Sequence, residues 1–373
     1  MNNIIDYVNQ YGKYDFNKKS FNEVDSLIFS ELSYLKFDSF FIGDAASDKP
    51  LHFNEMSHSP YFEALFQGLP DTVNNRALIL AAANAERFKN TIINYYSNIL
   101  DEEKELQFSA VTFFPQNELP YIAIRGTDET LIGWKEDFNM AFMYPVPAQE
   151  AGIRYLEQVA KDIQGLFRIG GHSKGGNIAV YASMKAKQTI RDRICDIFSH
   201  DGPGFKDELF NHPGYLEIQK RIHKTIPQSS VIGLLLQHQE IYKVVKSENF
   251  GILQHDPFSW VVHHGKFVQL EEVASNALLM NRTLNQWIAH MEDGDRKEFV
   301  NLIFGLFDAN EIKTVNELSE EWKAVLTSMI RARKELDDET IKFLDQTLLL
   351  LMKMGAQTIT KGKKGLKNAD AVN

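Results

Sequence analysis

FRIGGHSKGGNIAVY, at residues 167–181, has the pattern of a short β-strand that turns sharply at Ser173 into an α-helix. Within it, Gly171-His172-Ser173-Lys174-Gly175 fits the G-x-S-x-G motif, in which a serine on a strained turn presents its hydroxyl to a cleft. Glycines flank such a serine because a side chain there would collide with the neighbouring strand or helix. The helix that follows directs free N–H groups and its positive end at an oxyanion. The sequence therefore predicts that Ser173 is a nucleophile; the alternative is an inert serine in a glycine-rich turn.

The size and composition of the chain fit a globular protein. Its 373 residues are 44% hydrophobic, enough for a sizeable core, and its formal net charge of −10 argues against a nucleic-acid-binding role. The single cysteine, Cys195, cannot form an internal disulfide and is predicted to lie in a buried strand. The N-terminus lacks a basic segment followed by an apolar run, and the longest apolar stretches, 231–236 and 348–352, are too short to cross a bilayer. We therefore expect a cytoplasmic protein with no integral membrane segment.

Hydrophobic patterns predict that helices and strands alternate along most of the chain. The expected elements are helices within 1–40 (after a loosely packed start, with a capping box at 20–23), at 75–96 and at 150–164, a hairpin of strands 107–113 and 121–124, and strands at 194–199, 221–226 and 242–245. This order predicts an α/β fold with a mainly parallel sheet covered by helices on both faces.

From about residue 271 the apolar residues repeat at helical spacing alone. We therefore divide the chain into an α/β domain, 1–270, and a helical C-terminal subdomain, 271–373, that ends in a disordered basic tail. Trp287 and Trp322 lie on apolar helix faces that must be buried, either against the sheet of the α/β domain or against a partner subunit. In the second case the helices would form an oligomer.

A second motif lies upstream of the serine: Ile124-Arg125-Gly126-Thr127-Asp128, followed by Trp134 and Asp137. With the elbow at 171–176, it resembles the class 3 lipases of the α/β-hydrolase fold over about residues 105–265. In those lipases a strand ends in Arg-Gly-Ser/Thr, a Trp and an Asp follow, and a GHSLGG elbow comes later; here Lys174 replaces the leucine.

Two further stretches, residues 199–205 and 254–260, resemble more closely a group of uncharacterised bacterial lipase-like proteins of unknown function. Together the resemblances imply an α/β-hydrolase fold and a serine hydrolase of the lipase or esterase type, acting on a carboxylic ester that is a small molecule or a lipid.

A serine nucleophile needs a histidine base, which in α/β-hydrolases lies downstream of it in the chain. His255 is preferred because its loop, bounded by Gly251 and Pro257, follows the last expected core strand and lies in the family-like stretch. His238, His263 and His264 remain alternatives, and His255 could instead be a structural loop residue. The complete set of downstream histidines is His200, His212, His223, His238, His255, His263, His264 and His290.

The acid that orients this base is predicted to be Asp201, at the end of the strand 194–199. The resemblance places the usual class 3 acid one strand later, but residues 226–230 read Ile-Pro-Gln-Ser-Ser and contain no carboxylate. Glu240 and Asp256 are alternative acids, and Asp201 could instead only cap a turn.

The oxyanion hole should use two backbone N–H groups. One is that of Lys174, directly after the nucleophile, and the resemblance assigns the other to Thr127. Arg125 and Asp137 are expected to pair and brace that loop, or to form an ordinary surface ion pair. The apolar residues within 129–150 predict either a lid or acyl pocket, or a core helix with a packed loop.

Metal and cofactor sites are not predicted. His263-His264 lacks a spaced third ligand, and the glycine pairs match no phosphate-binding loop. Three hypotheses of function remain: a serine hydrolase that cleaves a carboxylic ester, a non-catalytic binding or scaffold protein on the same fold, and a hydrolase that uses the same residues on an amide or thioester. The second is motivated by the missing carboxylate near Ser229 and by the large helical C-terminal region.

Overall fold

The computed structural model describes residues 2–41, 51–69, 71–128, 130–140, 143–236 and 239–275, and single positions between 277 and 341. His238, Trp287, Trp322 and the basic tail lie outside the described residues. The C-terminal helical subdomain and the domain boundary at residue 270 therefore stay predictions.

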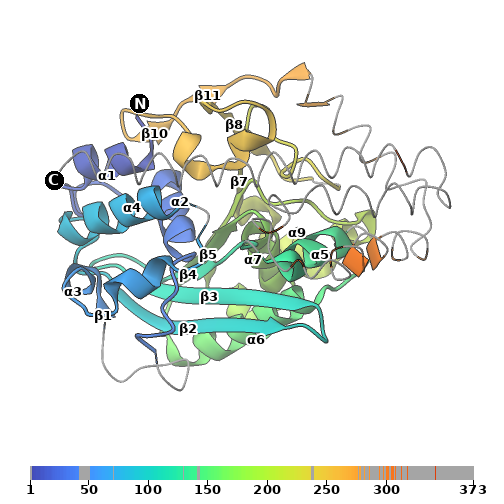
Figure 1. The fold of residues 1–373 in the computed structure, drawn as a ribbon, viewed down its shortest axis with the longest axis horizontal. Coiled ribbons are helices and arrows are strands. Elements are labelled where there is room, and N and C mark those ends of the chain that lie inside the picture. Colours follow the sequence, from blue (N-terminus) through green and yellow to red (C-terminus); the bar gives the residue numbers. More distant parts are fainter. Residues whose placement is uncertain are drawn as a thin grey trace.

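A nine-stranded sheet forms the centre of the described fold (Figure 1). Its spatial order is β1 (Leu51–His52), β2 (Ile92–Asp101), β3 (Leu106–Phe114), β4 (Tyr121–Ile124), β5 (Phe167–His172), β6 (Ile194–His200), β7 (Ile222–Pro227), β8 (Tyr242–Val245) and β11 (Gln269–Leu270). The strands β9 (Val262–His263) and β10 (Lys266–Phe267) form a separate antiparallel pair.

The sheet is mixed, which corrects the prediction of a mainly parallel one. Strands β4 to β8 run parallel, whereas β1 to β4 pair antiparallel and so do β8 and β11. The reason is connection length, because β2, β3 and β4 follow one another through short turns and short turns join only antiparallel strands. The parallel strands are those whose carboxyl ends carry the predicted site residues.

One predicted helix contains a strand. The helix expected at 75–96 is α4 (Thr72–Asn84), and β2 begins at Ile92. Ile92, Ile93, Tyr95 and Tyr96 are β-branched or aromatic and favour a strand, and pairing with β3 decides the outcome. The predicted hairpin of β3 and β4 is confirmed, as is β8 with its bounds.

Helices cover both faces of the sheet, as predicted. The α-helices are α1 (Ile4–Tyr11), α2 (Glu23–Leu32), α3 (Phe53–Met56), α4, α5 (Leu131–Asn139), α6 (Pro147–Asp162), α7 (Lys174–Lys185), α8 (Gln188–Arg191) and α9 (Pro213–Ile218). Short 3-10 turns are η1 (Phe62–Phe66), η2 (Asp207–Asn211), η3 (Gln219–Arg221), η4 (Gly251–His255) and η5 (Pro257–Ser259).

The alternation of β4 shows how the two helical layers form. Tyr121 and Ala123 pack with residues of α1, α2 and α4, while Ile122 and Ile124 pack with residues of α6, α7 and α9. Side chains alternate across a strand, so one short strand serves both hydrophobic cores. Cys195, on β6, is half-buried rather than buried as predicted.

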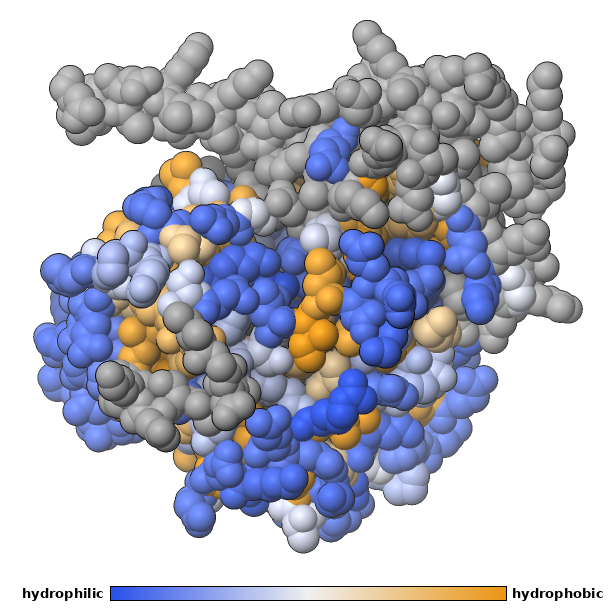
Figure 2. All heavy atoms as spheres, turned by 60° about the horizontal axis from the view of Figure 1, so that its bottom comes forward, coloured by the Kyte–Doolittle hydropathy of each residue, from blue (hydrophilic) through white to orange (hydrophobic). Residues whose placement is uncertain are grey.

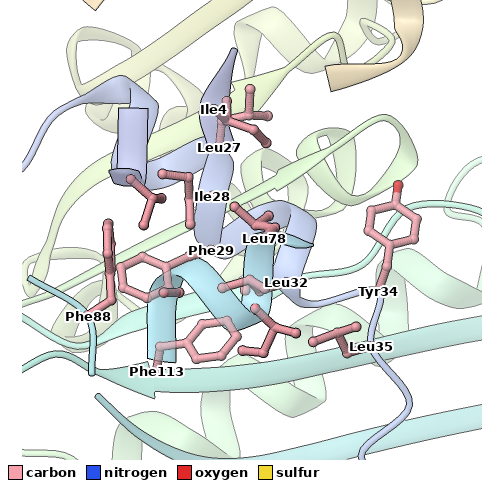
Figure 3. Packing of buried hydrophobic residues seen from close by; sticks show 14 of the residues in the cluster. Ile4, Leu27, Ile28, Phe29, Leu32, Tyr34, Leu35, Leu78, Phe88 and Phe113 are labelled. Carbon is pink, nitrogen blue, oxygen red and sulfur yellow. The ribbon is translucent and has the colours of Figure 1, made fainter. Parts of the chain in front are cut away.

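The start of the chain belongs to the first of these cores, which corrects the prediction of a loosely packed start. Asn3 caps α1 and Ile4 is fully buried. Figure 3 shows Ile4 with Leu27, Phe29 and Leu78 in the packed cluster of α1, α2 and α4. The capping box also lies two residues later than predicted. The Asn22 side chain caps α2, and the Asp25 carboxylate accepts a hydrogen bond from the backbone N–H of Asn22.

A buried arginine holds this N-terminal layer together. Arg87 donates to both carboxylate oxygens of Asp25, at 2.7 and 2.6 Å, and to the backbone carbonyls of Lys19 and Ser20. Its guanidinium also lies over the ring of Phe16. One side chain therefore joins α2, the loop before it and the segment after α4.

Replacing Arg87 by methionine should strongly destabilise the fold, because the Asp25 carboxylate would remain buried without its cation. The expected loss in the free energy of unfolding is about 3–5 kcal/mol. Arg76→Met is the matched control, since its pair with Glu63 is exposed and should contribute less than about 1 kcal/mol. Urea denaturation measures both, and equal losses would contradict the assignment.

Hydrophilic side chains predominate on the face of the molecule in Figure 2, with small hydrophobic patches between them. Among the helices that the structure describes, none is long and apolar enough to span a bilayer.

Candidate active site

Ser173 lies on the turn between β5 and α7, in a strained backbone conformation. Its φ of +57° and ψ of −134° fall outside the usual regions for a residue with a side chain. A side chain at Gly175 would come within 2.1 Å of the Ile124 carbonyl oxygen, and one at Gly171 within 2.4 Å of the Gly175 carbonyl carbon. The glycines flanking Ser173 are thus required by close packing against β4 and α7.

Asp201 and His255 meet next to this turn although 54 residues separate them. Nδ1 of His255 lies 2.6 Å from Oδ2 of Asp201, and the Asp201 carboxylate is buried at the end of β6. A carboxylate only accepts hydrogen bonds, so Nδ1 carries the proton and Nε2 is left with a free lone pair. This is the tautomer that a general base requires.

Ser230 contributes a second hydrogen bond to Asp201 that the sequence did not reveal. Its hydroxyl donates to Oδ1 of Asp201 at 2.5 Å, and the Gly233 N–H donates to the Ser230 hydroxyl oxygen at 3.0 Å. Ser230 follows β7, in the segment where the resemblance places the usual class 3 acid. That segment supplies a hydroxyl to Asp201 instead of a carboxylate.

A hydrogen bond joins Asp201 to His255, but among the described residues none joins His255 to the Ser173 hydroxyl. Within the described part of the chain, the imidazole reaches the elbow through His172, whose ring centroid lies 4.4 Å from that of His255. Nε2 of His172 donates to the backbone carbonyl of His255 at 2.9 Å, which fixes the loop that carries the imidazole.

Tyr34 extends this contact to the strand end at β4. Because Nε2 of His172 is the donor to a carbonyl, its Nδ1 accepts, and the Tyr34 hydroxyl donates to it at 3.2 Å. A Cβ placed on Gly126, just beyond the end of β4, would lie 2.1 Å from the Tyr34 hydroxyl oxygen, so the two segments are in close contact. In Figure 3 the Tyr34 hydroxyl points away from the other labelled side chains. Burial holds the pKa of His172 well below its ordinary value, so this imidazole stays neutral.

Thr127 and Lys174, the predicted oxyanion donors, lie on neighbouring turns. Lys174 is the first residue of α7, so its N–H has no partner within the helix. A Cβ placed on Gly126, directly before Thr127, would lie 3.1 Å from the Cβ of Ser173. The Thr127 hydroxyl donates to Oδ2 of Asp137 at 2.5 Å.

The predicted pair of Arg125 and Asp137 does not form. The Arg125 guanidinium donates instead to Asp128 and to Asn98, each at 3.2 Å. Asp128, three residues further along the chain, is therefore the carboxylate that pairs with Arg125. Asp137 holds the same loop through its hydrogen bond with Thr127.

Asp137 has an unusual carboxyl group. Burial raises the pKa of Asp137 to about 6, against the opposing effects of Lys174 and the Thr127 hydroxyl. The pKa of Asp137 is therefore higher in the folded protein than in the unfolded chain. Its contribution to the free energy of unfolding is fully present below about pH 4 and is lost as the pH rises through about 6.

Asp137→Asn should therefore stabilise the protein more at pH 8 than at pH 5. The asparagine carbonyl still accepts from the Thr127 hydroxyl, but no buried charge forms at high pH. Thermal melting of both proteins at the two pH values measures the difference. An equal shift in melting temperature at pH 5 and pH 8 would show that Asp137 does not titrate between them.

The alternative site residues lie elsewhere or outside the described residues. Glu240 contacts Tyr215 and Lys224, Asp256 caps a short turn, and His263 and His264 belong to the β9–β10 hairpin. Among the described residues, no group of three or more His, Cys, Asp or Glu side chains is placed to hold a metal ion.

A family model described as Mbeg1-like matches residues 82–305, more than half of the chain. The chain belongs to the Mbeg1-like family. The matched span contains every residue of the candidate site except Tyr34, and the family is lipase-like. No curated protein matches the sequence.

Three lipases are among the solved structures that are similar to this member of the Mbeg1-like family, each with low sequence identity. The crystal structure of M37 lipase has a TM-score of 0.36 and 14% identity, over 58% of this chain and 70% of the lipase. The Rhizomucor miehei lipase–propeptide complex has a TM-score of 0.36 and 13% identity, over 63% and 76%. A fungal lipase–inhibitor complex has a TM-score of 0.35 and 14% identity, over 54% and 83%.

Proposed function

We propose that this protein is a serine hydrolase of the lipase or esterase type that cleaves a carboxylic ester through an acyl-enzyme on Ser173. The observation that carries the proposal is the 2.6 Å contact between His255 Nδ1 and Asp201 Oδ2, beside a serine held at positive φ. Membership of a lipase-like family supports the class of reaction and leaves the substrate as part of the proposal.

In the proposed reaction, Nε2 of His255 takes the proton from the Ser173 hydroxyl as its oxygen attacks the ester carbonyl carbon. The N–H groups of Lys174 and Thr127 stabilise the oxyanion, and Asp201 stabilises the imidazolium. The carbonyl re-forms, and the alcohol leaves with the proton from Nε2. Water then gives a proton to the same nitrogen and attacks the acyl carbon. The bond from that carbon to the Ser173 oxygen breaks, the acid leaves, and Nε2 returns its proton to the Ser173 oxygen.

The substrate side of the proposal is an ester of a small molecule or a lipid, acted on in the cytoplasm without a cofactor. Nucleic acid is not an expected partner, because the net charge is −10. An oligomer formed through the C-terminal helices also remains a prediction.

A non-catalytic binding protein is the second candidate, and one observation favours it. No hydrogen bond joins the Ser173 hydroxyl to His255 among the described residues. Catalytic hydrogen bonds are often long in unliganded enzymes and shorten when substrate binds, so the hydrolase remains the better-supported function.

A panel of p-nitrophenyl esters with acyl chains from two to sixteen carbons separates the two functions. We expect saturable hydrolysis of part of the panel and a single preferred range of chain length. Amide and thioester analogues of the best substrate then define the bond that is cleaved. Binding of an ester without any turnover would favour the non-catalytic candidate.

A further inference from the structure

The side chain of Lys174 does not reach solvent, although it follows the candidate nucleophile directly. It is 1% exposed, and its ammonium group donates to the Gln107 side-chain oxygen at 2.7 Å and to the Gln107 backbone carbonyl at 3.1 Å. A third contact, at 2.9 Å, is with the carboxylate of Glu136. A buried ammonium group needs such partners, because a bare charge in a core is strongly disfavoured.

Glu136 joins four elements at a single carboxylate. It lies on α5, is fully buried, and accepts from Lys174 on α7 and from the Gln107 N–H on β3. Its other oxygen accepts from the Ala148 N–H in the first turn of α6, at 2.7 Å. Displacement of α5 would separate two buried charges and leave two buried N–H groups without an acceptor.

Close packing reinforces the position of α5. A Cβ on Gly133 would lie 2.8 Å from the Thr127 side chain and 3.0 Å from that of Gln107, so the helix backbone approaches the loop as closely as a glycine allows. At the far end, Asn139 and Lys135 both contact the Glu105 carboxylate at 2.7 Å.

The helix α5 also holds the loop after β4, which carries Thr127. Asp137, the neighbour of Glu136 on α5, holds the Thr127 hydroxyl. The ion pair of Glu136 and Lys174 therefore holds the helix that positions the candidate donor Thr127. The sequence left residues 129–150 open as a lid or as a core helix, and these contacts favour the core helix for α5.

We propose that α5 is a fixed wall of the site, and that the protein hydrolyses esters dispersed as single molecules without activation at a lipid–water interface. The kinetic part rests on the proposed function. A helix that must move away from the site before hydrolysis would make the rate rise when substrate aggregates, and a fixed wall would not.

Tributyrin tests the kinetic part, at concentrations that run from below to above its solubility limit. We expect the rate to follow one saturation curve through the limit. A rise of about fivefold or more on crossing it would overturn the proposal.

Amide hydrogen exchange of residues 131–140 tests the fixed wall independently of turnover. With and without Triton X-100 micelles, the exchange rates should agree within about twofold, and a tenfold increase with micelles would overturn the proposal. If the protein hydrolyses no ester, the proposed function fails, and the exchange result still decides whether α5 is fixed.

Glu136→Gln should raise exchange in α5 about tenfold, while Glu157→Gln, the matched control with an exposed partner 3.7 Å away, should not change it. If the single variant does not fold, the double variant Glu136→Gln with Lys174→Met is measured instead, because it removes both buried charges. Wild-type exchange rates in α5 of the folded variant would show that the ion pair does not hold the helix.

Discussion

Ser173→Ala is expected to abolish ester hydrolysis while the protein stays folded. In a well-studied serine hydrolase, loss of the nucleophile lowers kcat by about 10⁶, and the residual rate comes from binding and the oxyanion donors. Stability should change by no more than about 0.5 kcal/mol, because the hydroxyl has no hydrogen-bond partner among the described residues and the alanine keeps the backbone of the turn.

Steady-state hydrolysis and thermal melting check this result together. Ser183→Ala is a useful control, since its hydroxyl donates to the Ala179 carbonyl within α7 and lies outside the candidate site. Turnover of the Ser173 variant within about tenfold of the wild type would remove Ser173 from the mechanism.

Asp201→Asn should lower kcat by about 10⁴, the loss seen when the acid of a known triad is replaced by its amide. The amide can donate to Nδ1 of His255, which would move the imidazole proton to Nε2. The nitrogen that must accept the Ser173 proton would then already carry one. The fold should survive, because asparagine has the same shape and retains an acceptor for the Ser230 hydroxyl.

Ser230→Ala is the matched comparison for that variant. It removes the hydrogen bond to the other oxygen of Asp201 and leaves the contact with His255 in place. We expect a loss of about 10- to 100-fold, the equivalent of one hydrogen bond to a charged group. Kinetics over pH 5–9 compare the two, and losses of equal size would contradict the separate roles of acid and supporting hydroxyl.

The local motifs allowed the centre of the site to be predicted from the sequence. The elbow at Ser173 depends on glycines within two residues of it. Asp201 follows β6, which lies next to β5 in the sheet and parallel to it, so the two strands end close together. The position of His255 follows from a loop that returns over the same strand ends. The sequence order of the three residues and the missing carboxylate after β7 were sufficient to propose the pair that the structure joins.

Contacts between distant elements could not be predicted in the same way. Tyr34 and Ser230 are ordinary residues in their own segments, and only the packing of α2 and of the loop after β7 brings them to His172 and Asp201. A lysine in a glycine-rich turn is usually solvated, so burial of the Lys174 side chain depends on Glu136, which arrives from α5.

The errors in the fold have a similar origin. The residues of β2 extend a helical pattern from α4, and their place in the sheet depends on pairing with β3. The antiparallel pairing of β2, β3 and β4 follows from the two short turns that connect them. Local sequence patterns predict the strands but not their order or direction in the sheet.

Labelling of the folded protein with a fluorophosphonate, followed by peptide mass mapping, tests the proposed nucleophile most directly. The reagent phosphonylates a serine hydroxyl only when a neighbouring base activates it. We predict one adduct, on Ser173, that is lost in Ser173→Ala and strongly slowed in His255→Ala. A folded wild-type protein that forms no adduct, or that is labelled at another serine, would contradict the proposed mechanism.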